Sequence, residues 1–266
     1  MPFALIGFFL ATKSHDFDWM ILTYVILCMI FARSAAMGFN RYLDRESDSR
    51  NPRTSKSREI PNGKINAKSA LIFVIINCLL FIGSTYLINT TCLLLSPLAL
   101  LVILGYSFTK RFTMFCHLIL GLGLSLAPIG SYIAVTNSFD LIPILFSLTV
   151  IFWVSGFDII YSLQDEKFDK KERLKSIPVT FGAKASLIIS KIFHVISISV
   201  LFYIGILESY NFYYWIGFSV FLLLIMYQHT LVKHNDLSRV NLAFFTTNGI
   251  ASIVFGIFVI IELTIY

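Results

Sequence analysis

Long apolar stretches alternate with short polar connections along the whole chain. A helix that crosses a bilayer needs about 20 mostly apolar residues. Eight of the nine apolar runs reach this length, and the first is too short to span alone; the runs fall at 1–11, 19–40, 68–88, 91–108, 114–136, 140–163, 184–206, 211–232 and 240–264. The pattern predicts an all-α, polytopic membrane protein with nine transmembrane helices, the first of them truncated.

Composition supports lipid as the main solvent of this protein. Of its 266 residues, 57% are hydrophobic and 14% are charged, and the mean hydropathy is +0.79. A soluble domain carries about 25% charged residues, so this chain has too few polar side chains to cover a soluble core. The first run lacks a basic lead, which argues against a signal peptide. We expect residues 1–266 to form a single membrane domain.

Basic residues are confined to alternate connections between the apolar runs. All but three of the 21 lysines and arginines lie in four segments, 41–68, 110–111, 164–184 and 233–239. The positive-inside rule places such segments in the cytoplasm. We therefore expect a protein of the bacterial inner (cytoplasmic) membrane with its active site at the cytoplasmic face. Topology also accounts for the net charge of +6, so we expect no nucleic-acid partner.

Two of the basic segments are long, and each begins with a cluster of acidic residues. The first cluster is spaced i, i+4, i+8, which places its members on one face of a helix; it comprises Asn40, Asp44 and Asp48. The second cluster is spaced i, i+7, i+11, again on one face, with Tyr161 beside it; it comprises Asp158, Asp165 and Asp169. Such acids could merely solubilise helix ends, but two clusters at matched depth favour a functional site.

The chemistry of these clusters predicts a ligand. Carboxylates on two helix ends suit Mg²⁺, which binds through one or two carboxylates together with substrate phosphates. The neighbouring arginines and lysines suit phosphate oxygens. At a membrane surface, a diphosphate on an apolar chain is a polyprenyl diphosphate, with its chain among the helices. The scattered cysteines and histidines indicate no disulfide framework and no metal site, and His117, alone in an apolar run, is typical of a core histidine.

Arg33 is a basic residue inside an apolar run. It lies seven residues before Asn40, so it shares the face of the first cluster about two turns deeper. A charged side chain inside a span is costly unless it is paired or faces a cavity. We expect Arg33 to bind a second, anionic substrate below the diphosphate, with snorkelling as the alternative.

Three segments of the chain carry a family resemblance. They contain NRYLDRESDSRNPRT (40–54) with REIPNG (58–63), YSFTKRFT (106–113), and DIIYSLQDEKFD (158–169) with KSIPVTFG (175–182). On these motifs the chain resembles the UbiA superfamily of intramembrane prenyltransferases, in its 4-hydroxybenzoate polyprenyltransferase-like branch. The resemblance implies nine helices around a central cavity that is open to lipid, and Mg²⁺-dependent transfer of a prenyl group onto an aromatic acceptor in quinone biosynthesis.

The resemblance also implies roles for individual residues. Mg²⁺ and diphosphate would be held by Asn40, Asp44, Asp48, Asp165 and Asp169, and the diphosphate contacts would be Arg53, Arg58, Lys110, Arg111 and Lys175. The acceptor carboxylate would meet Arg33, while Tyr106 and Asp158 would line the cavity near the reacting carbon. We also expect Tyr161 to contact substrate. The chain departs from the family where Arg41 follows Asn40, where Ser107 follows Tyr106, and where Arg173 replaces a common glycine.

Several functions remain open at this stage. The acceptor could be 4-hydroxybenzoate or, in a menaquinone pathway, 1,4-dihydroxy-6-naphthoate, since both offer a carboxylate to Arg33. Other branches of the superfamily make chlorophyll, haem or ether lipids. A multi-span transporter is an alternative from another class, but it requires broken helices or repeats at mid-membrane, whereas these acids lie at one face. A scaffold would not need two acidic clusters.

Overall fold

The computed structural model describes all of residues 1–266 as a bundle of helices without β-strands. In chain order the helices are α1 (Pro2–Ala11), α2 (Trp19–Leu43), α3 (Arg45–Arg50), α4 (Ala67–Ile88), α5 (Thr90–Thr109), α6 (Cys116–Thr136), α7 (Leu141–Ser162), the 3₁₀ turn η1 (Leu163–Asp165), α8 (Glu166–Lys171), α9 (Ile177–Leu207), α10 (Phe212–Leu231), the π-helical segment η2 (Leu242–Thr247) and α11 (Asn248–Ile265). The all-α prediction is therefore confirmed.

Eight helices are long and apolar enough to cross a membrane. The first predicted helix corresponds to α1, which has 10 residues, so the predicted count of nine membrane-spanning helices is not confirmed. Most predicted boundaries lie within a few residues of the observed ones. The exception is α9, which begins at Ile177 rather than at residue 184. Its path includes a kink at Gly182, where φ is +76°. A positive φ favours glycine, and it allows the first turn of α9 to change direction.

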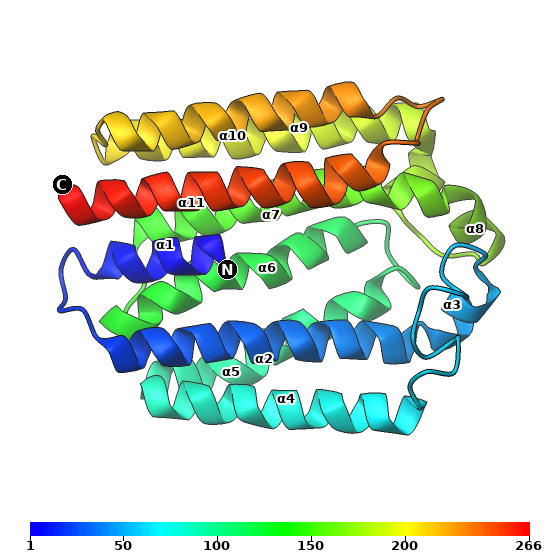
Figure 1. The fold of residues 1–266 in the computed structure, drawn as a ribbon, viewed down its shortest axis with the longest axis horizontal. Coiled ribbons are helices and arrows are strands. Elements are labelled where there is room, and N and C mark those ends of the chain that lie inside the picture. Colours follow the sequence, from blue (N-terminus) through cyan, green and yellow to red (C-terminus); the bar gives the residue numbers. More distant parts are fainter.

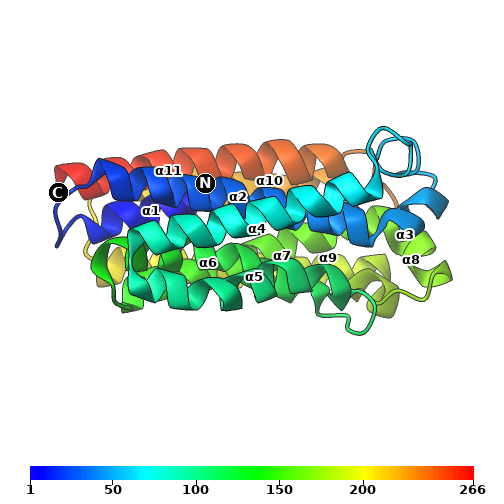
Figure 2. The same ribbon diagram turned by 90° about the horizontal axis from the view of Figure 1, so that it is seen from below.

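The basic connections gather at one end of the bundle. The long helices lie side by side, and α3, α8 and the connections that follow α5 and α10 lie together at the right-hand end in both views (Figures 1 and 2). We call this the site end. The basic segments, which alternate along the sequence, thus lie at the same end of the bundle.

Close helix contacts depend on small residues, as expected where lipid supplies no hydrophobic driving force between helices. A Cβ atom added to Gly7 on α1 would lie 2.0 Å from the carbonyl oxygen of Pro128 on α6. A Cβ added to Gly121 would lie 2.5 Å from the carbonyl oxygen of Ile151 on α7. These approaches bring α1, α6 and α7 together around the largest apolar cluster, which includes Phe146.

Helix α2 is the least covered of the long helices. Of its 25 residues only Val25 and Ala35 are buried. It packs mainly on α4 and α5 and has only a small contact with α1, so one face of α2 is not covered by other helices. Arg33 is exposed on α2.

The end of α8 explains one departure from the family pattern. The amide of Leu174 donates to the carbonyl of Asp169 at 2.9 Å, and the amide of Arg173 donates to the carbonyl of Lys170 at 3.3 Å. This is a Schellman motif, which usually has glycine in the left-handed position. Arg173 occupies that position with φ at +56°, so its backbone is strained.

Replacing Arg173 should therefore reveal this strain. Arg173→Gly removes the steric cost of a left-handed residue, which is about 1 kcal/mol, whereas Arg173→Ala removes the same guanidinium and keeps the cost. We expect the glycine variant to have the higher free energy of unfolding in detergent, measured by thermal or denaturant unfolding. Equal stability of the two variants would contradict this account.

Candidate active site

The first acidic cluster lies where α2 gives way to α3. Asp44 is the residue between the two helices, and Asp48 lies on α3. The Nδ2 group of Asn40 donates to Asp44 Oδ2 at 2.9 Å, which confirms the expected i, i+4 contact. The backbone of Asp44 departs from regular α-helical angles (φ −91°, ψ 5°), but the amide of Asp48 still donates to the carbonyl of Asp44 at 2.7 Å, so the two acids remain one turn apart.

The second cluster lies at the corresponding end of α7. Asp158 is on α7, Asp165 ends the 3₁₀ turn η1, and Asp169 is on α8. A 3₁₀ turn has 3.0 residues per turn instead of 3.6. The helical path therefore continues, but its register tightens between the first and second acids. A 3₁₀ turn thus interrupts the α-helix that was expected to carry all three acids, and Asp165 and Asp169 both lie at the site end.

A forked ion pair joins the second cluster to the first basic loop. Arg53 donates from Nε to Asp165 Oδ1 at 2.9 Å, and its Nη2 also pairs with Asp165 Oδ2. Asn51 adds a third donor to Asp165 Oδ1, at 3.0 Å. Two parallel bonds from one guanidinium fix geometry as well as charge. The loop after α3 is thereby held against η1, far away in sequence.

Further ion pairs connect the remaining acids and bases. Lys110 Nζ lies 2.6 Å from Asp169 Oδ2, and Arg111 Nη2 lies 3.3 Å from Asp44 Oδ1. The turn after α5 thus reaches both acidic clusters. Together with the Arg53 fork, these contacts bring three of the predicted acids and three of the predicted bases together at the site end.

Electrostatics at the first cluster favour an added cation. The pKa of Asp44 is raised to about 6, chiefly by burial and also by the charge of Asp48, while Arg111 and Lys110 act in the opposite direction. Burial also raises the pKa of Asp48, and nearby Asp165 adds to the effect. Carboxylates whose ionised forms are disfavoured in this way gain from a nearby positive charge.

The donor set fits Mg²⁺ chemically. The structure contains no group of three or more histidine, cysteine or acidic side chains arranged as a metal cage. Mg²⁺ does not require such a cage, because it usually binds one or two carboxylates with water and substrate phosphates. Asp48 forms no ion pair, and the other acids are paired with bases that suit phosphate.

Tyr161 lies between the arginine fork and an aromatic wall. Its hydroxyl accepts from Arg53 Nη1 at 3.2 Å, and the ring of Phe244 is 4.1 Å away, centroid to centroid. Phe244 belongs to the π-helical segment η2. Segments of this kind are frequent at functional sites, and here the segment places an aromatic ring beside the predicted substrate contact.

Asp158 has a partner that the sequence did not suggest. His117 Nδ1 lies 2.6 Å from Asp158 Oδ2. The His117 side chain is almost fully buried, whereas Asp158 stays partly exposed. His117 was interpreted as an ordinary core histidine; it is buried, but it also fixes the carboxylate that was expected to line the cavity.

Four of the predicted substrate-binding residues lie outside the ion-pair network. The ammonium of Lys175 donates to the carbonyl of Phe112 at 3.2 Å and contacts no acid. Arg58 has a buried Nη1 without a hydrogen-bond partner. Tyr106 is half-buried near the end of α5, and Arg33 is exposed on α2.

Sequence reasoning missed Asn51, His117, Phe244 and the outer pair of Arg50 with Glu172. Asn51 stands inside the first motif, so its position was available as a signal. Arg50 Nη2 and Glu172 Oε2 lie 2.6 Å apart, but they stand at the ends of two short charged helices far apart in sequence, where pairing cannot be read from spacing. Phe244 is one of 26 phenylalanines, and no local pattern distinguishes it.

Comparison with known proteins gives consistent results. The model of the UbiA prenyltransferase family matches residues 1–250. A protein of Vesicomyosocius okutanii named 4-hydroxybenzoate octaprenyltransferase is 31% identical over 251 residues, which cover 93% of this chain and 89% of that protein. A protein of the same name from Nitrosomonas eutropha is 30% identical over 241 residues, covering 90% and 83%.

Solved structures show the same architecture. The apo structure of a UbiA homologue from Aeropyrum pernix K1 has a TM-score of 0.89 and 28% identity, covering 98% of this chain and 95% of that one. A UbiA homologue from Archaeoglobus fulgidus, bound to DMAPP and Mg²⁺, has a TM-score of 0.71 and 17% identity, covering 100% and 96%. The second likeness concerns the fold alone.

The ion pairs make a prediction about stability. Lys110→Met strands Asp169, whose side chain is 3% exposed, whereas Arg50→Met leaves Glu172, whose side chain is 20% exposed. We expect the first change to cost about 2 kcal/mol and the second less than about 1 kcal/mol. Thermal unfolding in detergent with a chelator measures both.

A double variant provides the control for this prediction. Adding Asp169→Asn to Lys110→Met removes the stranded charge, so it should recover part of the lost stability. If Lys110→Met and Arg50→Met destabilise equally, burial of Asp169 does not set the cost.

Proposed function

The chain belongs to the UbiA prenyltransferase family, and from this premise we propose that it transfers a polyprenyl group from a polyprenyl diphosphate to a hydroxylated aromatic carboxylate such as 4-hydroxybenzoate. One observation carries the proposal: two acidic clusters and the bases Arg53, Lys110 and Arg111 converge at one end of a membrane-spanning bundle. The names of the relatives support the aromatic acceptor. Family membership also favours an enzyme over the transporter alternative.

The acids of the site would bind the diphosphate through Mg²⁺, and the bases would bind it directly. Asn40, Asp44, Asp48, Asp165 and Asp169 offer oxygen atoms for Mg²⁺. When bound, Mg²⁺ supplies positive charge that stabilises the leaving diphosphate.

The basic groups would hold the diphosphate itself. Arg53, Lys110 and Arg111 can exchange their carboxylate partners for phosphate oxygens, which guanidinium and ammonium groups bind equally well. Arg58 has a buried Nη1 that no protein atom bonds, so it can donate to phosphate without breaking a contact. Lys175 would have to leave the carbonyl of Phe112 to join them.

The reaction would break the bond between the allylic carbon and the diphosphate oxygen, and the electron pair would leave with diphosphate. A ring carbon of the acceptor would then bond the allylic carbon and lose its proton. Asp158, whose carboxylate contacts His117 at 2.6 Å, would accept that proton, with Tyr106 on α5 beside the reacting carbon. Apolar helices around the site would exclude water from the cation-like carbon, and Tyr161 with Phe244 would offer aromatic faces to it.

The acceptor would lie along the free face of α2. Arg33 is exposed there and forms no ion pair, so its guanidinium is available to the carboxylate of the acceptor. No observation favours 1,4-dihydroxy-6-naphthoate over 4-hydroxybenzoate, and the relatives favour the latter. Because the basic connections gather at the site end (Figure 1), the positive-inside rule supports a cytoplasmic active site in a bacterial inner membrane.

Loss of one carboxylate tests the diphosphate site. Asp165→Ala and Asp44→Ala should each reduce transfer of a radiolabelled polyprenyl group to 4-hydroxybenzoate to background, because each removes oxygen atoms proposed for Mg²⁺. Asp236→Ala is the matched control: Asp236 is a fully exposed acid in the loop after α10, and its carboxylate accepts hydrogen bonds only from Ser238. Full activity of Asp165→Ala, with the protein present in the membrane, would refute the metal assignment.

Kinetics of Arg33 variants test the acceptor site. Arg33→Met should raise the KM for 4-hydroxybenzoate by about tenfold or more while changing the KM for the diphosphate little, because only the acceptor carries the carboxylate that Arg33 would bind. Arg33→Lys retains the charge and should lie between. With phenol as acceptor the Arg33→Met effect should vanish; a larger effect on the diphosphate KM than on the acceptor KM would contradict the role.

A further inference from the structure

A cleft lies between α9 and α10, away from the acidic clusters. Its volume is about 450 Å³, and none of its lining residues belongs to the site described above; they are Lys191, His194, Val195, Ile198, Ser199, Leu222, Ile225, Met226 and His229. Helices α9 and α10 touch each other little along their length, so the cleft separates two neighbouring membrane helices.

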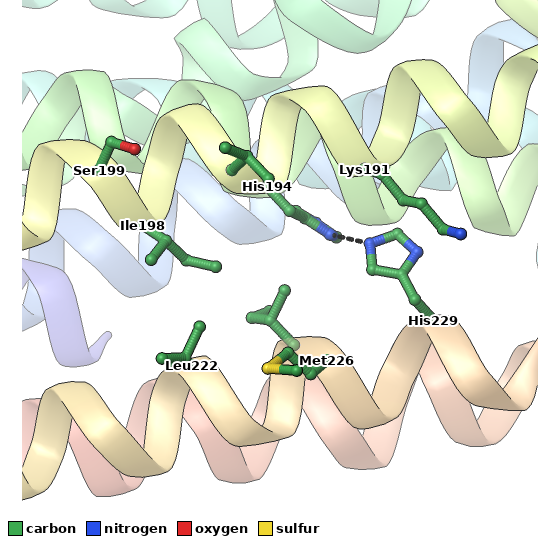
Figure 3. A pocket seen from close by; sticks show the side chains of 9 residues that line it. Lys191, His194, Ile198, Ser199, Leu222, Met226 and His229 are labelled. Atoms are coloured by element: carbon green, nitrogen blue, oxygen red, sulfur yellow. Dashed lines mark hydrogen bonds between the residues drawn. The ribbon is translucent and has the colours of Figure 1, made fainter.

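The cleft is polar at one end and apolar at the other. Figure 3 shows Lys191 and His229 together at one end, and Ile198, Ser199 and Leu222 at the other. His229 is two residues from the end of α10 at Leu231, which lies at the site end of the bundle. The polar end therefore faces the membrane surface, and the apolar end faces the middle of the bilayer.

Two histidines form a hydrogen-bonded chain at the polar end. His194 Nδ1 lies 2.7 Å from His229 Nε2, and His194 Nε2 lies 3.2 Å from the carbonyl oxygen of Trp153. His194 is 2% exposed, and its ring occupies space that only a glycine at 156 leaves free, since a Cβ there would lie 2.4 Å away. The ring is therefore fixed in place.

The carbonyl of Trp153 determines the protonation pattern of this chain. A carbonyl can only accept, so His194 must donate from Nε2. Neutral His194 then accepts at Nδ1 from the Nε2–H of His229, which leaves Nδ1 of His229 as an acceptor. No group in the protein donates to that atom, so His229 Nδ1 is an acceptor without a hydrogen-bond donor.

Lys191 brings an unpaired cation to the same end. Lys191 is exposed on α9 and lines the cleft beside His229 (Figure 3). No acidic side chain forms an ion pair with it. A cation within a span is costly unless it reaches the surface or meets an anion. The polar end thus has the positive charge of Lys191 next to the acceptor His229 Nδ1, and the rest of the cleft is lined by apolar side chains.

We propose that this cleft binds one anionic phospholipid whose head group carries a free hydroxyl, as phosphatidylglycerol does. The phosphate pairs with Lys191, and the hydroxyl donates to His229 Nδ1. One acyl chain runs along Ile198, Leu222 and Met226 toward the bilayer centre. Charge complementarity and the direction of the cleft carry the assignment, because basic pockets between membrane helices at the surface level bind anionic head groups.

Lipid competition separates the two contacts. The purified protein in neutral detergent is offered phosphatidylglycerol, phosphatidylethanol and phosphatidylcholine with identical chains, and retained lipid is counted by native mass spectrometry. Phosphatidylethanol keeps the net negative charge but lacks the hydroxyl. We expect one retained lipid. Phosphatidylethanol should be preferred over phosphatidylcholine by about fivefold through its charge alone, and phosphatidylglycerol should be preferred over both because it also has the hydroxyl.

Matched variants assign the preference to residues. Lys191→Met should abolish the preference for both anionic lipids over phosphatidylcholine, whereas Lys68→Met, which removes an exposed lysine at the start of α4 at the same end of the bundle, should not. His229→Phe should remove the advantage of phosphatidylglycerol over phosphatidylethanol and keep both ahead of phosphatidylcholine. Thermal unfolding of each variant in phosphatidylcholine checks that the bundle is intact.

Two results would overturn the proposal. One is an unchanged lipid preference in a folded Lys191→Met protein, which would place any anionic lipid elsewhere. The other is displacement of the lipid by a prenylated hydroxybenzoate at equal concentration in the wild type but not in Lys191→Met, which would assign the cleft to that class of amphiphile. Neither result depends on the transfer activity.

Discussion

Attraction between acids of one half of the chain and bases of the other holds the site end together. Lipid supplies no hydrophobic force between helices, so the polar loops beyond the membrane need contacts of their own. The fork from Arg53 to Asp165 and the pair of Lys110 with Asp169 supply them. Each contact joins segments far apart in sequence, and each uses a carboxylate that burial would otherwise penalise. The position of both acidic clusters depends on these pairs.

The same pairing explains how one set of residues could both fold and bind. Buried charges are costly without partners, and in the ligand-free protein acids and bases are partners to each other. In the proposed function a cation and an anion would enter together and take over both roles, so no buried charge would lose its partner. Asp48, which has no basic partner, and Arg58, which has a free Nη1, are the residues that would gain most.

The sequence predicted the spans well because lipid requires long apolar helices, and the ends of α4, α6 and α7 lie within two residues of expectation. It predicted the acids because carboxylates at the ends of apolar runs stand out. It could not predict the breaks at Asp44 and at η1, since hydrophobic periodicity carries no signal in polar segments. It also could not predict that Asn51 and His117 are partners of Asp165 and Asp158, because those pairings arise only from packing.

The two polar regions of the bundle differ in what satisfies them. At the site end, most carboxylates and bases find partners within the chain, with Asp48 and the Nη1 of Arg58 as exceptions. In the α9–α10 cleft, the hydrogen bonds from His229 through His194 to the Trp153 carbonyl satisfy every imidazole nitrogen except one. The missing donor and the counter-ion of Lys191 have to come from outside the chain, at the membrane surface that this end of the cleft faces. Phospholipid head groups are the abundant anions at that level of the membrane.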